Sequence, residues 1–266
     1  MKTGGFIPYG RQWIDGSDIR AVVSVLKSDF LTQGQEIERF EKKLRALTGA
    51  KYCVAVANGT AALHLAVAAL DLKRGREGIT STNTFVASAN AMVYNGLIPV
   101  LADIEPETGN ISVSDMEERL SRKTRLLLPV HFAGQPADMA RVRALARRRG
   151  LRVIEDAAHA IGSRYRDGSP VGNCRFSDLT TFSFHPVKTI TSGEGGAVTT
   201  NDKKLYERLM LLRTHGITRE GLRRSAAPRP WYYEMQALGF NYRMTDLQAA
   251  LGSSQLEKLG AFVRRR

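Results

Sequence analysis

The sequence predicts an α/β protein built on a mostly parallel sheet with helices on both faces. From residue 52 onward, short apolar segments typical of strands alternate with longer segments of helical periodicity. This alternation is typical of βαβ units, whose strands run parallel. The chain has 266 residues, of which 43% are hydrophobic, so it can bury a large core. One large domain is the simplest organisation.

The first fifty residues are expected to form an arm followed by two helices. Pro8 and Gly10 disfavour a helix over residues 6–14, so this segment is predicted to be extended. Residues 15–27 show one apolar face and predict a helix capped by Asp15 or Ser17. A polar turn, SDFLTQG, separates it from a second amphipathic helix over residues 35–47.

The core of the domain, about residues 51–260, is expected to carry the sheet. Strands are predicted over residues 52–57, 78–81, 98–102, 125–130 and 151–155. Helices are predicted over residues 60–70, 85–94 and 137–149. A last helix is predicted from about Thr245 to the end of the sequence, and part of its apolar face is expected to be uncovered, at Leu256, Leu259 and Phe262.

The composition limits the classes of partner. The formal net charge of +13 suits an anionic ligand. Because the basic residues are dispersed and lack interleaved aromatic residues, we expect no nucleic-acid binding. A solvated basic surface or the attraction of small phosphorylated ligands remains open. With no apolar run near 18 residues and no signal-peptide pattern, a cytoplasmic protein without membrane contact is expected.

The two cysteines, Cys53 and Cys174, can form no disulfide framework and lack the spacing of metal ligands. A reducing compartment therefore fits the sequence, and no metal site is expected.

Lys188 is the first candidate catalytic residue. It lies in TFSFHPVKTITSGEGGAVTTN, residues 181–201, where strand-forming residues flank a stretch with one proline and several hydroxyls and glycines. This pattern predicts a constrained loop between two strands. A partly buried lysine in such a loop is suited to act as an amine nucleophile with a lowered pKa, although most lysines are surface charges.

Asn58-Gly59-Thr60 is a candidate phosphate site. It ends a predicted strand and opens a helix, where free N–H groups and the helix dipole favour an anion. A plain helix N-cap by Asn58 or Thr60 is an equal alternative. The sequence contains neither GxGxxG nor GxxxxGK[ST], which disfavours dinucleotides and nucleoside triphosphates.

Asp156 and His159 follow the strand predicted over residues 151–155. A carboxylate at this position can pair with a cationic ring nitrogen, whereas the alternatives are a helix N-cap at Asp156 and a core histidine at His159. Phe85 offers an aromatic face. A lysine for an aldehyde, donors for a phosphate, an acid for a ring nitrogen and an aromatic residue together predict a pyridoxal phosphate site.

Several segments carry a family resemblance over essentially the whole chain: NGTAALHLA, ITSTNTFVASANA, EDAAHAIGS, DLTTFSFHPVKTITSGEGGAVTTND and GFNYRMTDLQAALGSSQL. They resemble the DegT/DnrJ nucleotide-sugar aminotransferases, which have the fold-type I architecture of pyridoxal phosphate enzymes. The resemblance implies a seven-stranded, mostly parallel sheet flanked by helices. Family members continue for roughly another hundred residues, so residues 1–266 are expected to be the large domain without the small one.

The resemblance also implies roles for individual residues. Lys188 would bond to the cofactor, Asp156 would pair with its ring nitrogen, Phe85 would pack on the ring and His159 would lie beside it. Residues implied to bind the phosphate are Gly59, Thr60, Ser183 and, from a neighbouring subunit, Asn241. Residues implied to face the nucleotide sugar are Tyr9, Asp29, Phe30, Leu31 and Thr32.

Within the family, SFHPVK and WYYEMQALGFNYR are most similar to members that act in pseudaminic acid biosynthesis. The resemblance implies a UDP-linked 4-keto-6-deoxy-N-acetyl-hexosamine as acceptor, L-glutamate as amino donor and a homodimer with shared active sites. Perosamine-type aminotransferases and a catalytically silent oligomerisation module are the alternatives. A sugar 3-dehydratase is disfavoured, since that class has histidine where this chain has Lys188.

Overall fold

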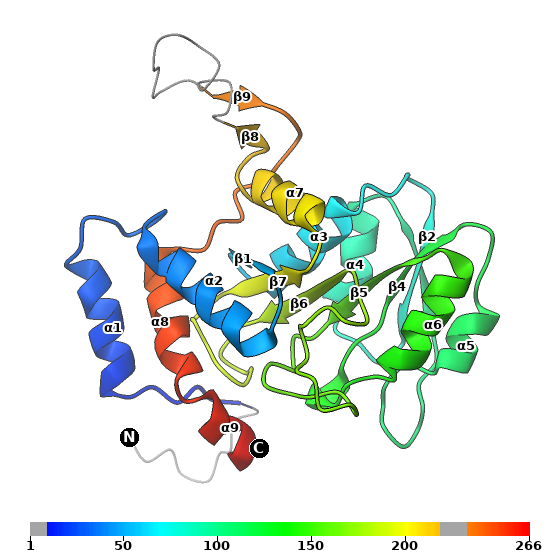
Figure 1. Ribbon diagram of the computed structural model, residues 1–266, viewed down its shortest axis with the longest axis horizontal. Coiled ribbons are helices and arrows are strands. Elements are labelled where there is room, and N and C mark those ends of the chain that lie inside the picture. The colour runs from blue at the N-terminus through cyan, green and yellow to red at the C-terminus, as the bar shows by residue number, and fades with distance from the viewer. Residues whose placement is uncertain (1–9, 219–232) are drawn as a thin grey trace.

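The computed structural model describes residues 10–218 and 233–266. Its centre is a seven-stranded sheet with the order β1-β7-β6-β5-β4-β2-β3 (Figure 1). The strands are β1 Tyr52–Val56, β2 Glu77–Ser81, β3 Ile98–Ala102, β4 Thr124–Leu128, β5 Arg152–Asp156, β6 Leu179–Ser183 and β7 Gly196–Thr200. Within this sheet only β7 runs against its neighbours, β1 and β6. The predicted mostly parallel, seven-stranded α/β fold is confirmed.

The sheet is buried on both faces because successive residues of a strand point to opposite sides. In β1, Cys53 and Ala55 join one core cluster, while Val54 and Val56 join the other. The second cluster includes side chains of α3 Gly59–Ala69, α4 Ala87–Tyr94 and α7 Lys203–Arg213. The first cluster includes side chains of α2 Gln35–Thr48, α5 Val113–Glu118, α6 Met139–Arg149 and α8 Asp246–Leu256.

Three smaller elements complete the described chain. The 3-10 helix η1 spans Phe132–Gly134 and follows β4. Strands β8 Ile217–Thr218 and β9 Glu234–Met235 form a separate two-stranded sheet, which projects away from the main sheet (Figure 1). None of the helices in the described ranges is both long and apolar enough to cross a membrane.

Helix α1, Gly16–Leu26, begins as the sequence predicts, with Asp15 as its N-cap in a capping box with Asp18. Asp18 is fully buried between α1 and the C-terminal helices. It accepts hydrogen bonds from Gln255 Nε2 at 2.9 Å and from Lys258 Nζ at 2.6 Å. These contacts attach the N-terminal helix to the end of the described chain.

The prediction of one long C-terminal helix is wrong. The helix is interrupted after α8, and α9 spans Leu259–Arg265. At the break, the Lys258 N–H bonds to the Gln255 carbonyl three residues back, which tightens the turn. The expected uncovered apolar face is also wrong, because Leu259 is only 4% exposed and the Phe262 ring packs edge-on against Trp13.

For most of the other helices and strands, the observed boundaries differ from the predicted ones by one to two residues. Helix α4 begins at Ala87, so Phe85 lies in the loop before it. No helix follows Asp156, which overturns the alternative that this residue is a helix N-cap. Helices α5 and α7 were not identified from the sequence.

We predict that Asp246→Ala will lower the free energy of unfolding by about 1–3 kcal/mol. Asp246 is 1% exposed and accepts hydrogen bonds from the backbone N–H groups of Gly34 and Glu36, at 2.8 and 3.0 Å. The substitution leaves both partly buried N–H groups without this acceptor. Urea denaturation will measure the change, with the exposed Asp29→Ala as control. Equal stability of the two variants would contradict this assignment.

Candidate active site

Lys188 lies in the loop between β6 and β7, at the end of the sheet where the parallel strands finish. The loop is held by its own backbone, with the Lys188 N–H bonded to His185 O at 2.9 Å and the Ser192 N–H bonded to Phe184 O at 3.0 Å. The lysine side chain is half-buried. Burial lowers the pKa of Lys188, Asp156 opposes that shift and Arg266 adds to it. The three charged groups are therefore close enough to interact.

Asp156 ends β5 and is 4% exposed. Its Oδ2 accepts a hydrogen bond from Ser88 Oγ at 2.7 Å, and its Oδ1 accepts one from the Ala158 N–H at 3.1 Å. Each carboxylate oxygen has two lone pairs, so both keep acceptor capacity. A cationic ring nitrogen could bind to that capacity, as the pyridoxal phosphate prediction requires.

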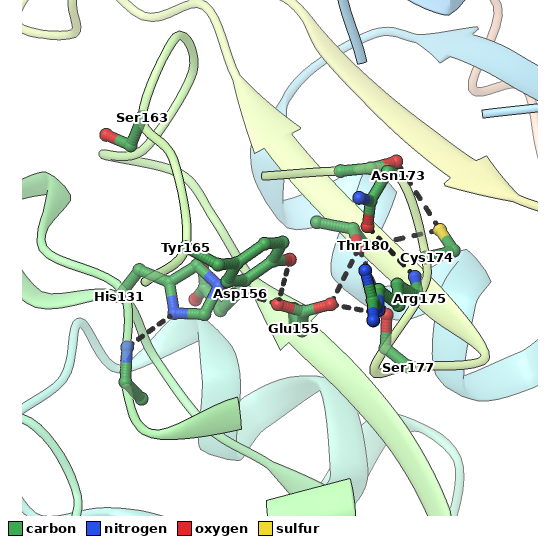
Figure 2. Close-up of polar contacts among 12 residues, drawn as sticks. His131, Glu155, Asp156, Ser163, Tyr165, Asn173, Cys174, Arg175, Ser177 and Thr180 are labelled. Carbon is green, nitrogen blue, oxygen red and sulfur yellow. Dashed lines mark hydrogen bonds and ion pairs between the residues drawn. The ribbon is translucent and has the colours of Figure 1, made fainter. Parts of the chain in front are cut away.

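The preceding residue, Glu155, anchors the strand end from inside the core (Figure 2). Figure 2 shows His131, Tyr165 and Ser177 directed at its carboxylate. His131 Nδ1 accepts a hydrogen bond from the Ala137 N–H, so the proton of the ring is on Nε2. The Nε2–H group donates a hydrogen bond to Glu155 Oε2 at 2.8 Å. Burial would raise the pKa of Glu155, but the hydrogen bonds from His131, Ser177 and Tyr165 outweigh it and hold that pKa below its ordinary value.

The same network fixes the backbone of Asp156. The His131 N–H donates to Asp156 O at 3.0 Å, and the Asp156 N–H donates to Pro129 O at 2.9 Å. Both the N–H and the carbonyl of Asp156 are therefore hydrogen-bonded, which fixes the backbone that carries its carboxylate. This rigidity suits a group that must stay in register with a bound ring.

The expected phosphate cradle is formed by the start of α3 and the end of β6. Asn58 is the N-cap, and its Oδ1 accepts from the Ala61 N–H at 2.8 Å, so the N-cap interpretation is confirmed. The N–H groups of Gly59 and Thr60 precede the first helical hydrogen bond and point out of the helix start. A Cβ added to Gly59 would lie 2.8 Å from Ser183 Cβ, so glycine is needed for this approach. An anion could bind there without any rearrangement of the cap.

Two further features fit a bound aromatic cofactor. Phe85 is 72% exposed, which is unusual for a large apolar ring and leaves its face free for stacking. His159 Nδ1 is buried and has no hydrogen-bond partner among the described residues. Burial, with the charge of Lys188, lowers the pKa of His159, which favours a neutral ring. The residues present therefore fit pyridoxal phosphate.

The predicted substrate residues are less closely tied to this site. Tyr9 lies outside the described residues. Thr32 forms a bridge with Thr245 that joins the turn of residues 29–32 to the start of α8, and Phe30 and Leu31 are 61% and 46% exposed. Asn241 is exposed and bridges to Thr214. Their roles remain predictions.

Sequence reasoning missed three residues that support the site. Ser88 could have been found, because it lies in the first turn of α4, three residues after the candidate Phe85, and its hydroxyl is 2.8 Å from that of Thr84. His131 carried no motif, since its partner Glu155 is 24 residues away. Arg266 lay in a basic run that resembles a solvated surface.

A half-buried lysine, an anchored carboxylate and a helix start with free N–H groups lie at one end of this sheet, the arrangement expected of a pyridoxal-phosphate-dependent transferase of fold type I. Residues 12–266 match the model of the DegT/DnrJ/EryC1/StrS aminotransferase family. The chain belongs to this family. Both the expected aminotransferase class and the pyridoxal phosphate cofactor are thereby confirmed.

Individual relatives agree with this assignment. The chain is 40% identical to GDP-perosamine synthase of Escherichia coli O157:H7 over 262 residues, which are 98% of this chain and 68% of the relative. Its fold is similar to that of PseC of Helicobacter pylori, an aminotransferase involved in the biosynthesis of pseudoaminic acid, with a TM-score of 0.88 and 34% identity over 96% of this chain and 66% of that one.

A third relative is the putative sugar aminotransferase Spr1654 of Streptococcus pneumoniae, solved in a PLP form. It matches with a TM-score of 0.86 and 29% identity, over 96% of this chain and 67% of that one. The chain thus spans about two thirds of the length of these relatives.

We predict that the apparent pKa of Lys188 in the cofactor-free protein lies below the ordinary value of 10.5, because burial disfavours the ammonium form. Asp156→Asn should lower the pKa further by removing an opposite charge, and Arg266→Ala should raise it by removing a like charge. Competitive acetylation over a pH series, with mass spectrometry of the Lys188 peptide, will measure it. A pKa at or above 10.5 would contradict the geometry.

We predict that Tyr165→Phe will lower the free energy of unfolding by about 1–3 kcal/mol. Tyr165 is 6% exposed and its hydroxyl donates to Glu155 Oε2 at 2.6 Å, so the variant removes one donor from a buried carboxylate. Chemical denaturation will report the loss. The matched control is Tyr94→Phe, whose ring is 55% exposed; a control that loses as much stability would disprove the role of the network.

Proposed function

We propose that this chain is the cofactor-binding part of an aminotransferase that moves the amino group of L-glutamate to C4 of a UDP-linked 4-keto-6-deoxy-N-acetyl-hexosamine. The reaction would belong to pseudaminic acid biosynthesis. One observation carries the proposal. Lys188, after β6, and Asp156, at the end of β5, lie at the same end of the sheet as the start of α3, and the charge of Asp156 acts on Lys188. Similarity to PseC supports the pathway.

Pyridoxal phosphate, when bound, supplies an aldehyde that reacts with amines and a ring that withdraws electrons. The lowered pKa of Lys188 increases the fraction of its amine that is neutral and can attack that aldehyde. The carboxylate of Asp156 would hold the ring nitrogen of the cofactor and favour its protonated form. Gly59, Thr60 and Ser183 would hold the phosphate, while Phe85 and His159 would pack against the ring.

Once its amine is free again, Lys188 moves a proton at the carbon atoms that exchange nitrogen. Its Nζ takes the proton from the carbon that carries the amino group of the donor. In the second half of the reaction it returns a proton to C4 of the sugar. A partly buried amine suits both steps, because a pKa below the ordinary lysine value brings its neutral and protonated forms closer in free energy.

The proposed assembly is a cytoplasmic homodimer with shared active sites. Asn241 is exposed, and in this proposal it reaches the phosphate site of the neighbouring subunit. Exposed apolar side chains of α4 and β3, including Val93, Tyr94, Ile98 and Leu101, support a partner surface next to Phe85. Tyr9 and the turn of residues 29–32 would face the nucleotide sugar.

We predict that Lys188→Ala will abolish the visible absorbance that pyridoxal phosphate gains on covalent attachment to a lysine, because the variant removes the amine that the proposal assigns to this bond. Lys51→Ala, at an exposed lysine, is the matched control and should retain the band. Absorbance spectroscopy and mass spectrometry after borohydride reduction will locate the attachment. Retention of the band in Lys188→Ala would refute the proposed site.

The half-reaction separates the remaining alternatives. Formation of 2-oxoglutarate from L-glutamate is expected for an aminotransferase, whereas cofactor binding without it would support the silent oligomerisation module. The 40% identity to GDP-perosamine synthase favours a perosamine-type enzyme as the second candidate. Faster amination of a GDP-linked than of a UDP-linked keto sugar would select that candidate.

A further inference from the structure

A buried polar pair lies one helical turn behind the phosphate cradle. His64 is on α3, four residues after Thr60, so the two side chains lie on the same face of the helix. His64 is 8% exposed, and its Nδ1 is 3.0 Å from Tyr242 Oη. Among the buried residues of α3, a helix described over its whole length, His64 is the one with a polar side chain. Burial of that side chain is favourable only with a hydrogen-bond partner, which Tyr242 supplies.

The pair belongs to an aromatic cluster. The centroid of the His64 ring is 4.6 Å from that of Phe240 and 5.3 Å from that of Tyr94, and the rings of Phe240 and Tyr242 are stacked at 5.0 Å. Burial lowers the pKa of His64 and raises the pKa of Tyr242. Both shifts favour the neutral forms, so the hydrogen bond joins two uncharged groups. It attaches Tyr242 to α3 without placing a further charge near the cradle.

Residues 240–243 run along the end of β1, where the chain enters the cradle. The Ala57 N–H donates to Tyr242 O at 2.9 Å, and Val56 of β1 forms an antiparallel bridge with this segment. Ala57 directly precedes Asn58, the N-cap of α3. The backbone of Tyr242 therefore holds the chain just before the helix start, while its hydroxyl is bonded to the same helix one turn later.

The same segment carries Asn241, the residue proposed to reach the phosphate site of the neighbouring subunit. Successive side chains of an extended segment point to opposite sides. Phe240 and Tyr242 are partly buried and contact His64, while Asn241 between them is exposed. The bond between Tyr242 and His64 therefore fixes the direction in which Asn241 points.

We propose that His64 and Tyr242 are positioning residues for the cofactor phosphate, acting through the start of α3 and through Asn241. The inference rests on the proposed function, which assigns the phosphate to this helix start. Neither side chain of the pair is given a contact with the phosphate. Their hydrogen bond keeps α3 and the segment of residues 240–243 in one arrangement, so that the N–H groups of the cradle and the amide of Asn241 are preorganised for the anion.

The test compares the binding of pyridoxine 5′-phosphate and of pyridoxine by isothermal titration calorimetry. Neither compound has an aldehyde, so neither can bond to Lys188, and the ratio of their dissociation constants measures the contribution of the phosphate. We expect Tyr242→Phe, which keeps the ring and removes the hydroxyl, to weaken binding of the phosphate compound by about threefold or more. The affinity for pyridoxine should stay the same.

Two variants of the histidine and one control complete the test. His64→Leu fills the helix position with an apolar side chain and should reduce the contribution of the phosphate likewise. His64→Asn, whose side-chain oxygen can take the place of Nδ1, should restore part of it. The matched control is Tyr206→Phe on α7, whose ring packs against the same core cluster and stacks on Tyr52 at 4.8 Å. It should leave the ratio of the two dissociation constants unchanged.

An unchanged ratio in both Tyr242→Phe and His64→Leu would overturn the proposal, as would an equal change in Tyr206→Phe. Equal weakening of both compounds would also overturn it, because a purely structural pair would loosen the site for ring and phosphate alike. If His64→Leu does not fold, Tyr242→Phe decides alone. These outcomes do not involve Lys188, whereas the proposed function fails if pyridoxal phosphate does not attach covalently to Lys188 in the wild-type protein.

Discussion

The site depends on two neighbouring carboxylates at the end of β5, which the alternation of a strand turns to opposite faces of the sheet. Glu155 is surrounded by donors from His131, Tyr165, Ser177 and Thr180, so its charge is satisfied inside the core. From the described residues, Asp156 receives one hydroxyl and one backbone N–H. The first carboxylate stabilises the strand end, and the second keeps acceptor capacity for a ligand.

The amine of Lys188 is held in a balance of opposing effects. Burial and the charge of Arg266 favour its neutral form, while Asp156 favours the ammonium. An amine that must form and release a covalent bond needs both its neutral form and its ammonium form to be populated at one pH. The constrained loop between β6 and β7 makes this balance possible, because it keeps the lysine near Asp156 without a direct ion pair that would trap its charge.

The sequence predicted the parts of this site that depend on local patterns. Gly59 and Asp156 lie directly after strands, and the carboxyl ends of parallel strands meet at one edge, so their proximity follows from the fold class. His131 and Arg266 could not be found in this way, because their roles depend on contacts with Glu155 and with the backbone of Lys188. The break before α9 was missed for a similar reason. Residues 245–266 keep helical periodicity throughout, whereas the residue at the break, Lys258, contacts Asp18 of α1, which is distant in the sequence.

The excess of positive charge has a spatial distribution that composition alone could not reveal. On α6 and β5, Arg143, Arg148 and Arg152 are each paired with Asp178 or Glu117, so their charges are largely compensated. The arginines beside Lys188 have no such acids within the described ranges. Uncompensated charge in a small recess produces a stronger local potential than the same charge dispersed over a surface, since less solvent screens it. The excess of positive charge is therefore left uncompensated beside Lys188, whereas on α6 and β5 it is paired with acids.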